Sequence, residues 1–273
     1  MALPITPELV DRAAEGLAAS GWRYTPRQLY YATCAAAETP PPSSRAVSSS
    51  IIGFGAIVVL VSLIVVSHRI AFVALLSAGA AVILLGLVER IRPPPALSGR
   101  VLAISYPDFI SRFGSQPRGG LLEMGTGQPE WMVAGAETVV FCDASETAAL
   151  VNANVERAGL QSAVAVDASS MPDSLHTVRV VALHDASPAG CALPVRLHEL
   201  GLGPVIDAGL RPGAISTGRY QVIEGAPARM QADLSGRFGS DEIAWLASGR
   251  RLELAVFTPE QILGMVAGAL SEG

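Results

Sequence analysis

Charged side chains are scarce in this chain of 273 residues, where Asp, Glu, Lys and Arg make up 16% of the sequence, against about 25% in soluble domains. The apolar share of 50% is ordinary. The high mean hydropathy of +0.42 therefore reflects missing charge, and the hydrophobicity should be concentrated in one part of the chain. We expect neither a disordered chain nor a protein that is soluble throughout.

Cysteine is rare as well, and basic residues do not gather into a stripe. Three cysteines cannot form a disulfide-rich scaffold and are typical of a reducing compartment. The 24 acidic residues outnumber the 19 basic ones and give a net charge of −5. Because a DNA-binding protein neutralises several phosphates with Lys and Arg, this charge does not favour a nucleic-acid partner, although it leaves one open.

Two runs without a formally charged residue lie at 47–66 and 70–88. Each has about the 20 apolar residues that a helix needs to cross roughly 30 Å of hydrocarbon. Only Ser67, His68 and Arg69 separate the runs. The pattern predicts two transmembrane helices in a tight hairpin, and a hairpin buried in a soluble fold is the alternative.

The arginines beside these runs predict an orientation. Only Arg69 lies between the runs, whereas several arginines lie outside them: Arg23, Arg27, Arg45, Arg90, Arg92 and Arg100. By the positive-inside rule, we expect both termini in the cytoplasm and the hairpin in the cytoplasmic (inner) membrane, with the lipid bilayer as a partner. Small residues such as Ser77 and Ala81 would let helices pack closely, as in a homo-oligomer.

The remaining segments form two folded parts and two linkers. Residues 1–38 predict a short helical, helix-turn-helix-like unit, because Thr6-Pro7 and Thr25-Pro26 each mark a helix start. Proline and serine make 39–46 a linker, and prolines make 89–100 a stiff exit from the second run. Residues 101–273 then alternate short apolar runs with helical ones, which predicts an α/β domain of a sheet flanked by helices.

Within that domain we expect five strands and four helices. The strands are predicted at 138–142, 163–166, 178–183, 204–207 and 252–257, and the helices at 146–158, 188–200, 240–248 and 259–270.

Two aspartates follow predicted strands and are candidate metal ligands. Asp143 comes directly after the strand at 138–142, and Asp185 comes soon after the strand at 178–183. If these strands are neighbours, both carboxylates face one crevice and could hold Mg²⁺ together with water. The alternative is that each aspartate caps the helix that follows it.

These residues resemble the Toprim family, in particular the A subunit of type IIB topoisomerases and the related meiotic double-strand-break protein. Those proteins place a Glu after one strand, which Asp143 resembles, and Asp-x-Asp-Pro-x-Gly after a later one. The stretch Asp185-Ala186-Ser187-Pro188-Ala189-Gly190 is similar to the second motif, with Ser187 replacing an acid. Near the N-terminus, Arg27-Gln28-Leu29-Tyr30-Tyr31 is similar to the stretch whose last tyrosine attacks DNA.

The resemblance implies a Toprim-like open sheet, Mg²⁺ at Asp143 and Asp185, and Tyr31 in the position of the nucleophile. Because the acidic set is incomplete, we expect a cytoplasmic, non-catalytic Toprim-like domain that binds or scaffolds protein partners at the membrane. One alternative is a Mg²⁺-dependent, topoisomerase-like phosphodiester enzyme that uses Tyr31. A second alternative is an oligomeric membrane scaffold.

Overall fold

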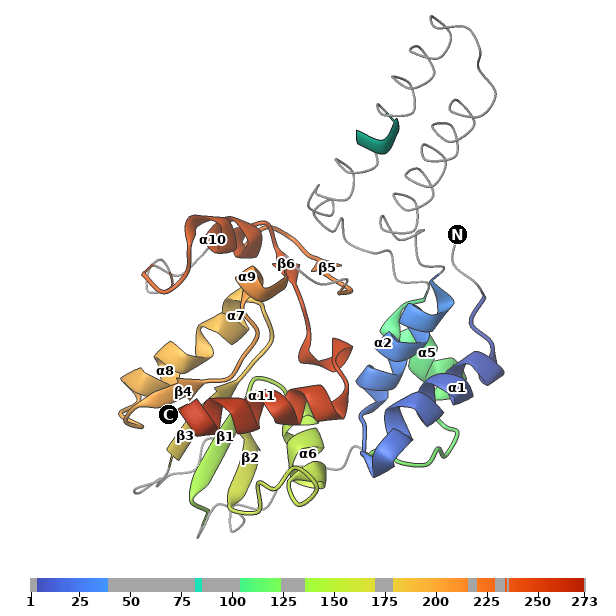
Figure 1. The fold of residues 1–273 in the computed structure, drawn as a ribbon, viewed down its shortest axis with the longest axis horizontal. Helices are drawn as coiled ribbons and strands as arrows, with labels where there is room; N and C mark the ends of the chain where they lie inside the picture. Colours follow the sequence, from blue (N-terminus) through green and yellow to red (C-terminus); the bar gives the residue numbers. More distant parts are fainter. Residues whose placement is uncertain are drawn as a thin grey trace, which may run out of the picture. The chain divides into compact units, whose positions relative to one another are not determined.

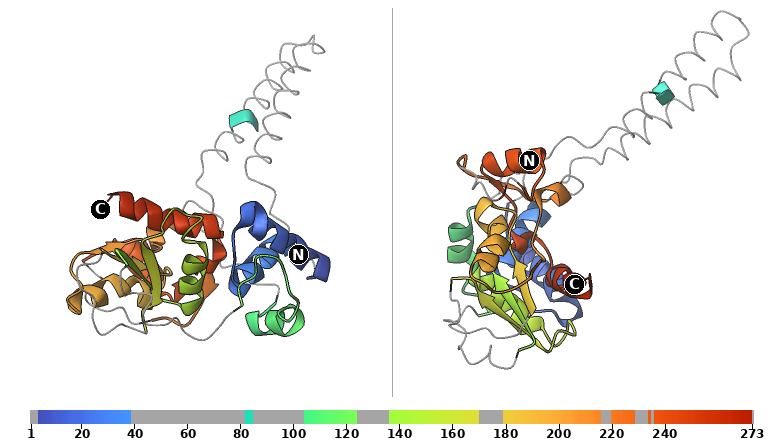
Figure 2. Two further views of the ribbon diagram at one scale, coloured as in Figure 1. Left: turned by 90° about the horizontal axis from the view of Figure 1, so that it is seen from below. Right: turned by 90° about the vertical axis from the view of Figure 1, so that its left-hand side faces the viewer.

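The computed structural model describes residues 4–38, 82–84, 104–123, 136–169, 179–215, 220–228, 234 and 236–272. The chain divides into two compact units, one made of Met1–Glu38 with Leu97–Gly273 and the other of Thr39–Ala96. Every labelled helix and strand belongs to the first unit (Figures 1 and 2).

The membrane prediction is wrong for the part of the chain that the structure describes, where no helix has the length and apolar character of a membrane span. The longest described helix is α11, Pro259–Glu272, with 14 residues. At 1.5 Å per residue it measures about 21 Å, less than the roughly 30 Å of a hydrocarbon layer. The predicted spans at 47–66 and 70–88 lie outside the described residues, apart from 82–84. The predicted localisation in the cytoplasmic membrane therefore has no support.

The N-terminal helices form where proline and threonine predict them. Helix α1 spans Pro7–Ala18, a 3₁₀ turn η1 spans Ala19–Gly21, and α2 spans Pro26–Ala37. Thr25 and Gln28 form a reciprocal capping box at the start of α2. A later helix, α5 at Tyr106–Phe113, packs its phenylalanines against these helices in one apolar cluster.

A parallel four-stranded sheet forms the centre of the remaining part, as the sequence predicts for the fold class. The strands are β1 (Thr138–Cys142), β2 (Ala163–Asp167), β3 (Arg179–Leu183) and β4 (Val205–Asp207). Their order is β2-β1-β3-β4, and all three pairings are parallel. The carboxyl ends of β1, β2 and β3 therefore lie along one edge.

Helices and short elements surround this sheet (Figure 1). They are α6 (Ser145–Asn154), α7 (Pro188–Cys191), α8 (Leu193–Glu199), α9 (Pro212–Ile215), α10 (Ser240–Ala247), η4 (Leu254–Val256) and α11. A two-stranded antiparallel pair joins β5 (Ile223–Glu224) to β6 (Arg250–Arg251).

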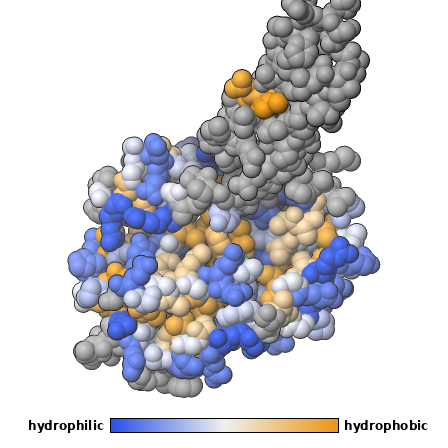
Figure 3. All heavy atoms as spheres, in the orientation of Figure 1, coloured by the Kyte–Doolittle hydropathy of each residue, from blue (hydrophilic) through white to orange (hydrophobic). Residues whose placement is uncertain are grey.

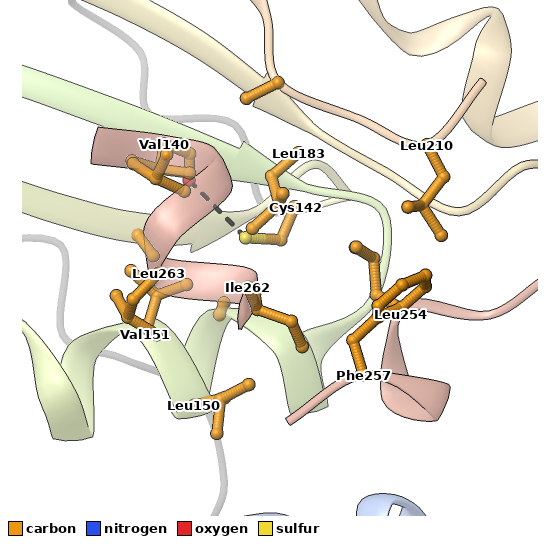
Figure 4. Packing of buried hydrophobic residues seen from close by; sticks show 14 of the residues in the cluster. Val140, Cys142, Leu150, Val151, Leu183, Leu210, Leu254, Phe257, Ile262 and Leu263 are labelled. Carbon is orange, nitrogen blue, oxygen red and sulfur yellow. Dashed lines mark hydrogen bonds between the residues drawn. The ribbon is translucent and has the colours of Figure 1, made fainter. Parts of the chain in front are cut away.

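Alternate residues of the strands enter two separate cores. Val140 and Cys142 of β1 pack with Ile262 and Leu263 of α11 and with side chains of α6 (Figure 4). On the opposite face, the intervening strand residues pack with α8. Burial on both faces explains why β1 is apolar at almost every position. On the face in Figure 3, polar and apolar side chains are intermingled over the described residues.

One strand prediction is wrong. The apolar run at 252–257 forms a single antiparallel bridge from Leu252 to Ala186 and then turns into η4. The Leu254 N–H donates to a carboxylate oxygen of Asp185 at 2.6 Å rather than to a neighbouring strand. A tertiary hydrogen bond thus overrides the local strand preference.

Candidate cation-binding pocket

Strand register brings the two predicted aspartates together. Cys142 and Leu183 are paired residues of β1 and β3, so the chain segments that follow them leave the sheet side by side. Asp143 Oδ2 accepts the backbone N–H of Asp185 at 2.8 Å. Both carboxylates line the same pocket, as the sequence predicts for neighbouring strands.

The capping alternative is wrong for both aspartates. The N-cap of α6 is Ala144, which makes no side-chain capping bond. The N-cap of α7 is Ser187, whose hydroxyl accepts the N–H of Gly190 at 3.0 Å. Neither carboxylate therefore caps the helix that follows it in the sequence, and Ser187 has a structural role.

Gly190 keeps the segment after β3 close to Asp143. A Cβ at this position would lie 2.4 Å from the carbonyl oxygen of Asp185 and 2.9 Å from Asp143 Oδ2. Any larger residue would push the two aspartates apart, so the glycine of the Asp185–Gly190 motif is needed for the geometry of the pocket.

The pocket is strongly acidic. It has a volume of about 400 Å³ and opens between the strand ends, the start of α6, α2 and η4. Among its described lining residues, Arg27 alone carries a positive charge. Five carboxylates line it: Asp143, Glu146, Asp167, Asp185 and Glu253.

The negative charges of Asp143 and Asp185 are poorly compensated by the protein. Asp143 Oδ1 is buried and has no hydrogen-bond partner among the described residues. Burial raises the pKa of Asp143, and burial together with the charge of Asp143 raises the pKa of Asp185 to about 8. A cation between these carboxylates would offset the cost of burying them.

The buried imidazole of His184 supports the same loop. One ring nitrogen lies 2.8 Å from the carbonyl oxygen of Asp185, and the other lies 3.0 Å from Asp207 Oδ1. Burial lowers the pKa of His184, but the hydrogen bond and charge of Asp207 outweigh it, so the net effect raises this pKa. His184 therefore holds the backbone of Asp185 in place.

Helix α2 closes one side of the pocket through Arg27. Its guanidinium lies 3.0 Å from Glu253 Oε2 and 3.6 Å from Glu146 Oε2. It also lies over the ring of Tyr106, 4.5 Å from the ring centroid. Burial lowers the pKa of Arg27, but the two carboxylates more than compensate and raise it overall.

Tyr31 lies beside the pocket, although it does not line it. Its hydroxyl donates to Glu253 Oε2 at 2.9 Å, and the residue is only 3% exposed. Burial and the charge of Glu253 raise the pKa of Tyr31. In this arrangement the Tyr31 hydroxyl is protonated and buried, and it donates to the carboxylate of Glu253.

The donor set suits a hard divalent cation. Carboxylate oxygens are the ligands that Mg²⁺ prefers, and Mg²⁺ keeps several waters while using one or two carboxylates. Asp143, with its unpartnered Oδ1, and Asp185 would hold the ion. Within the described ranges no group of three or more His, Cys, Asp or Glu side chains is arranged around a single metal position. Water would therefore complete the coordination.

Three acidic residues of the pocket are not found from the sequence. Asp167 directly follows the predicted strand at 163–166 and ends β2, a signal that could have indicated it. Glu146 lies in the first turn of the helix after Asp143 and could have been found in the same way. Glu253 carries no such signal, because the run around it reads as a strand.

No protein family, curated protein or solved structure matches the chain, so the pocket is interpreted from its own geometry.

Proposed function

We propose that this chain is a binding protein with a Toprim-like, non-catalytic α/β part that takes a divalent cation between Asp143 and Asp185. The observation that carries this proposal is the buried, unpartnered Oδ1 of Asp143 beside Asp185 in a pocket of five carboxylates. Two adjacent buried carboxylates are unfavourable alone, and a bound cation removes that cost.

The Toprim-like assignment is supported by topology and chemistry. Asp143 follows β1 and Asp185 follows the later strand β3, and the acidic motifs of that family likewise follow one strand and a later one. The second motif of the family carries one more acid, and this chain has Ser187 there as a helix cap. The missing acid and the buried Tyr31 favour binding over catalysis.

A calorimetric titration of the full chain with Mg²⁺ and with Mn²⁺ tests the proposal. We expect one binding event in the wild type and at least a tenfold weaker affinity in Asp143→Asn and in Asp185→Asn. Asp241→Asn, which removes a carboxylate from the exposed surface of α10, is the matched control and should bind as the wild type does. A folded wild type that binds neither cation would refute the proposal.

The enzyme alternative keeps one observation in its favour, because Glu253 links the tyrosine to the pocket. Its carboxylate accepts the Tyr31 hydroxyl, and the next residue, Leu254, donates to Asp185. If α2 moved, the Tyr31 oxygen could attack a phosphodiester phosphorus, form a phosphotyrosyl bond and release a sugar hydroxyl. Mg²⁺-dependent covalent attachment to DNA that Tyr31→Phe abolishes would establish this alternative over the non-catalytic one.

A further inference from the structure

Arg27 is the cation that the pocket already contains. It stands in the first turn of α2, and its guanidinium bridges Glu253 of the segment before η4 and Glu146 of the first turn of α6. The first turn of α2 is therefore tied to both sides of the pocket by carboxylates that face the Asp143–Asp185 pair.

We propose that Arg27 is an intramolecular counter-ion that competes with the divalent cation, so that filling the pocket loosens the first turn of α2. The inference rests on the proposed function and deepens it, because it assigns a regulatory role to the N-terminal helices. A divalent cation and a guanidinium in one pocket of about 400 Å³ repel each other. The cation also attracts the carboxylates of Glu253 and Glu146, and this weakens their ion pairs with Arg27.

The coupling must act in both directions. If the cation weakens the hold on Arg27, removal of the Arg27 charge must strengthen the binding of the cation by the same factor. Typical couplings between two sites are about 5- to 150-fold. Because Arg27 contacts two carboxylates of the pocket, we expect a coupling of about tenfold.

Other contacts keep the N-terminal helices attached while the Arg27 contact opens. The side chain of Gln28 donates to the carbonyl of Phe257 at 2.9 Å. Asn154 accepts the N–H of Arg23 and donates to its carbonyl, each at 2.9 Å. These bonds carry no charge and are not affected by a cation. The expected motion is thus a local loosening around Arg27 and Tyr31.

Calorimetry on the full chain separates the effect of the Arg27 charge on Mg²⁺ binding from the effect of the side chain's shape. Arg27→Gln should bind Mg²⁺ about tenfold more tightly than the wild type. Arg27→Lys keeps the charge and should bind Mg²⁺ more weakly than Arg27→Gln does. Arg12→Gln removes an exposed arginine of α1 and controls for net charge, so it should bind as the wild type does.

The outcomes distinguish this inference from the proposed function. If the wild type binds Mg²⁺ and Arg27→Gln binds equally or more weakly, the counter-ion inference is overturned and the binding function stands. If neither protein binds, both are overturned.

Hydrogen exchange of the wild type gives a second readout that needs no variant of Arg27. With saturating Mg²⁺ the backbone amides at the start of α2 should exchange about tenfold faster, and Asp143→Asn should show no such change. Slower or unchanged exchange on Mg²⁺ binding overturns the inference even where Arg27→Gln fails to fold.

Discussion

Asp185 is the residue whose buried charge most clearly lowers the stability of the folded protein. Its carboxylate accepts one backbone N–H, from Leu254, but it is buried beside Asp143. The pKa of Asp185 is about 8 in the folded chain, against an ordinary value of 3.8. Between these two pH values the folded state holds more protons than the unfolded state. The free energy of unfolding therefore falls as the pH rises through this window.

We expect Asp185→Asn to stabilise the cation-free protein at high pH. Asparagine is neutral at every pH, and its Oδ1 can still accept the Leu254 N–H. In the presence of a chelator the thermal midpoint of the variant should exceed that of the wild type by about 3 °C at pH 8. The difference should shrink at pH 5, where Asp185 of the wild type is protonated.

Thermal unfolding at the two pH values, followed by circular dichroism, measures this difference. Asp241→Asn should match the wild type at both values. A variant that is less stable than the wild type at pH 8 would contradict the assigned cost of the Asp185 charge.

The sequence predicts some residues of the pocket and misses others for a physical reason. Asp143 and Asp185 follow apolar strands, and the ends of neighbouring parallel strands meet at one edge. Glu253 reaches the pocket because the chain turns at Leu254, which bonds to a carboxylate 69 residues away. Local apolar pattern contains no information on that bond.

At the level of elements, β2 is an edge strand of the described sheet, and such an edge can pair with another chain. Among the residues that the structure describes, β2 pairs with β1 on one side and with no strand on the other. Asn152 of α6 covers part of the other side, where its amide donates to the carbonyl of Ala165 at 2.7 Å and its oxygen accepts the Ala165 N–H at 2.8 Å. A side chain thus satisfies the groups through which another chain could pair.

Asn152→Ala should lower the free energy of unfolding by about 2 kcal/mol, because it removes two hydrogen bonds and leaves partly buried backbone groups unpaired. It should also increase self-association at high concentration. Urea unfolding and light scattering measure the two effects. The exposed Glu156→Ala is the control, and a variant of unchanged stability would contradict the role given to Asn152.

Element prediction succeeds where a strand or helix has its own signal. The strand at 138–142 is confirmed in both bounds as β1. The helix predicted at 188–200 is instead two helices, α7 and α8, which meet at Ala192. Proline follows closely at Pro194 and lies in the first turn of α8. Pro194 is the sequence signal of this break, because proline fits the first turn of a helix but not its interior.

At the scale of the whole molecule, the N-terminal helices and the α/β part form one compact unit. Apolar side chains such as Ala255 and Val256 pack against the cluster of the N-terminal helices, and polar bonds join the two parts as well. Asn154 binds both backbone groups of Arg23, and Gln28 binds Phe257. Neither amide stands out in the sequence, because single Asn and Gln residues carry no pattern. Sequence analysis therefore finds both parts and misses how they are joined.

Asn154→Ala tests this contact between the N-terminal helices and the α/β part. It removes two bonds to Arg23 and one to the carbonyl of Leu150, and we expect a loss of about 2 kcal/mol of unfolding free energy. Tryptophan fluorescence and far-ultraviolet circular dichroism should still change in one transition, since Gln28 and Arg27 keep the parts attached. Two separate transitions in the wild type would show that the parts fold independently.

The bond between Tyr31 and Glu253 also has a consequence for the order of folding. It joins residues 222 positions apart, and closing so long a loop is entropically expensive until other contacts have formed. Helices α1 and α2 can form early from local signals, but the pocket is complete only when η4 has folded against the segment that follows β3. We expect the N-terminal segment, which is synthesised first, to form its final contacts last. Completion of the pocket is then the last step of refolding.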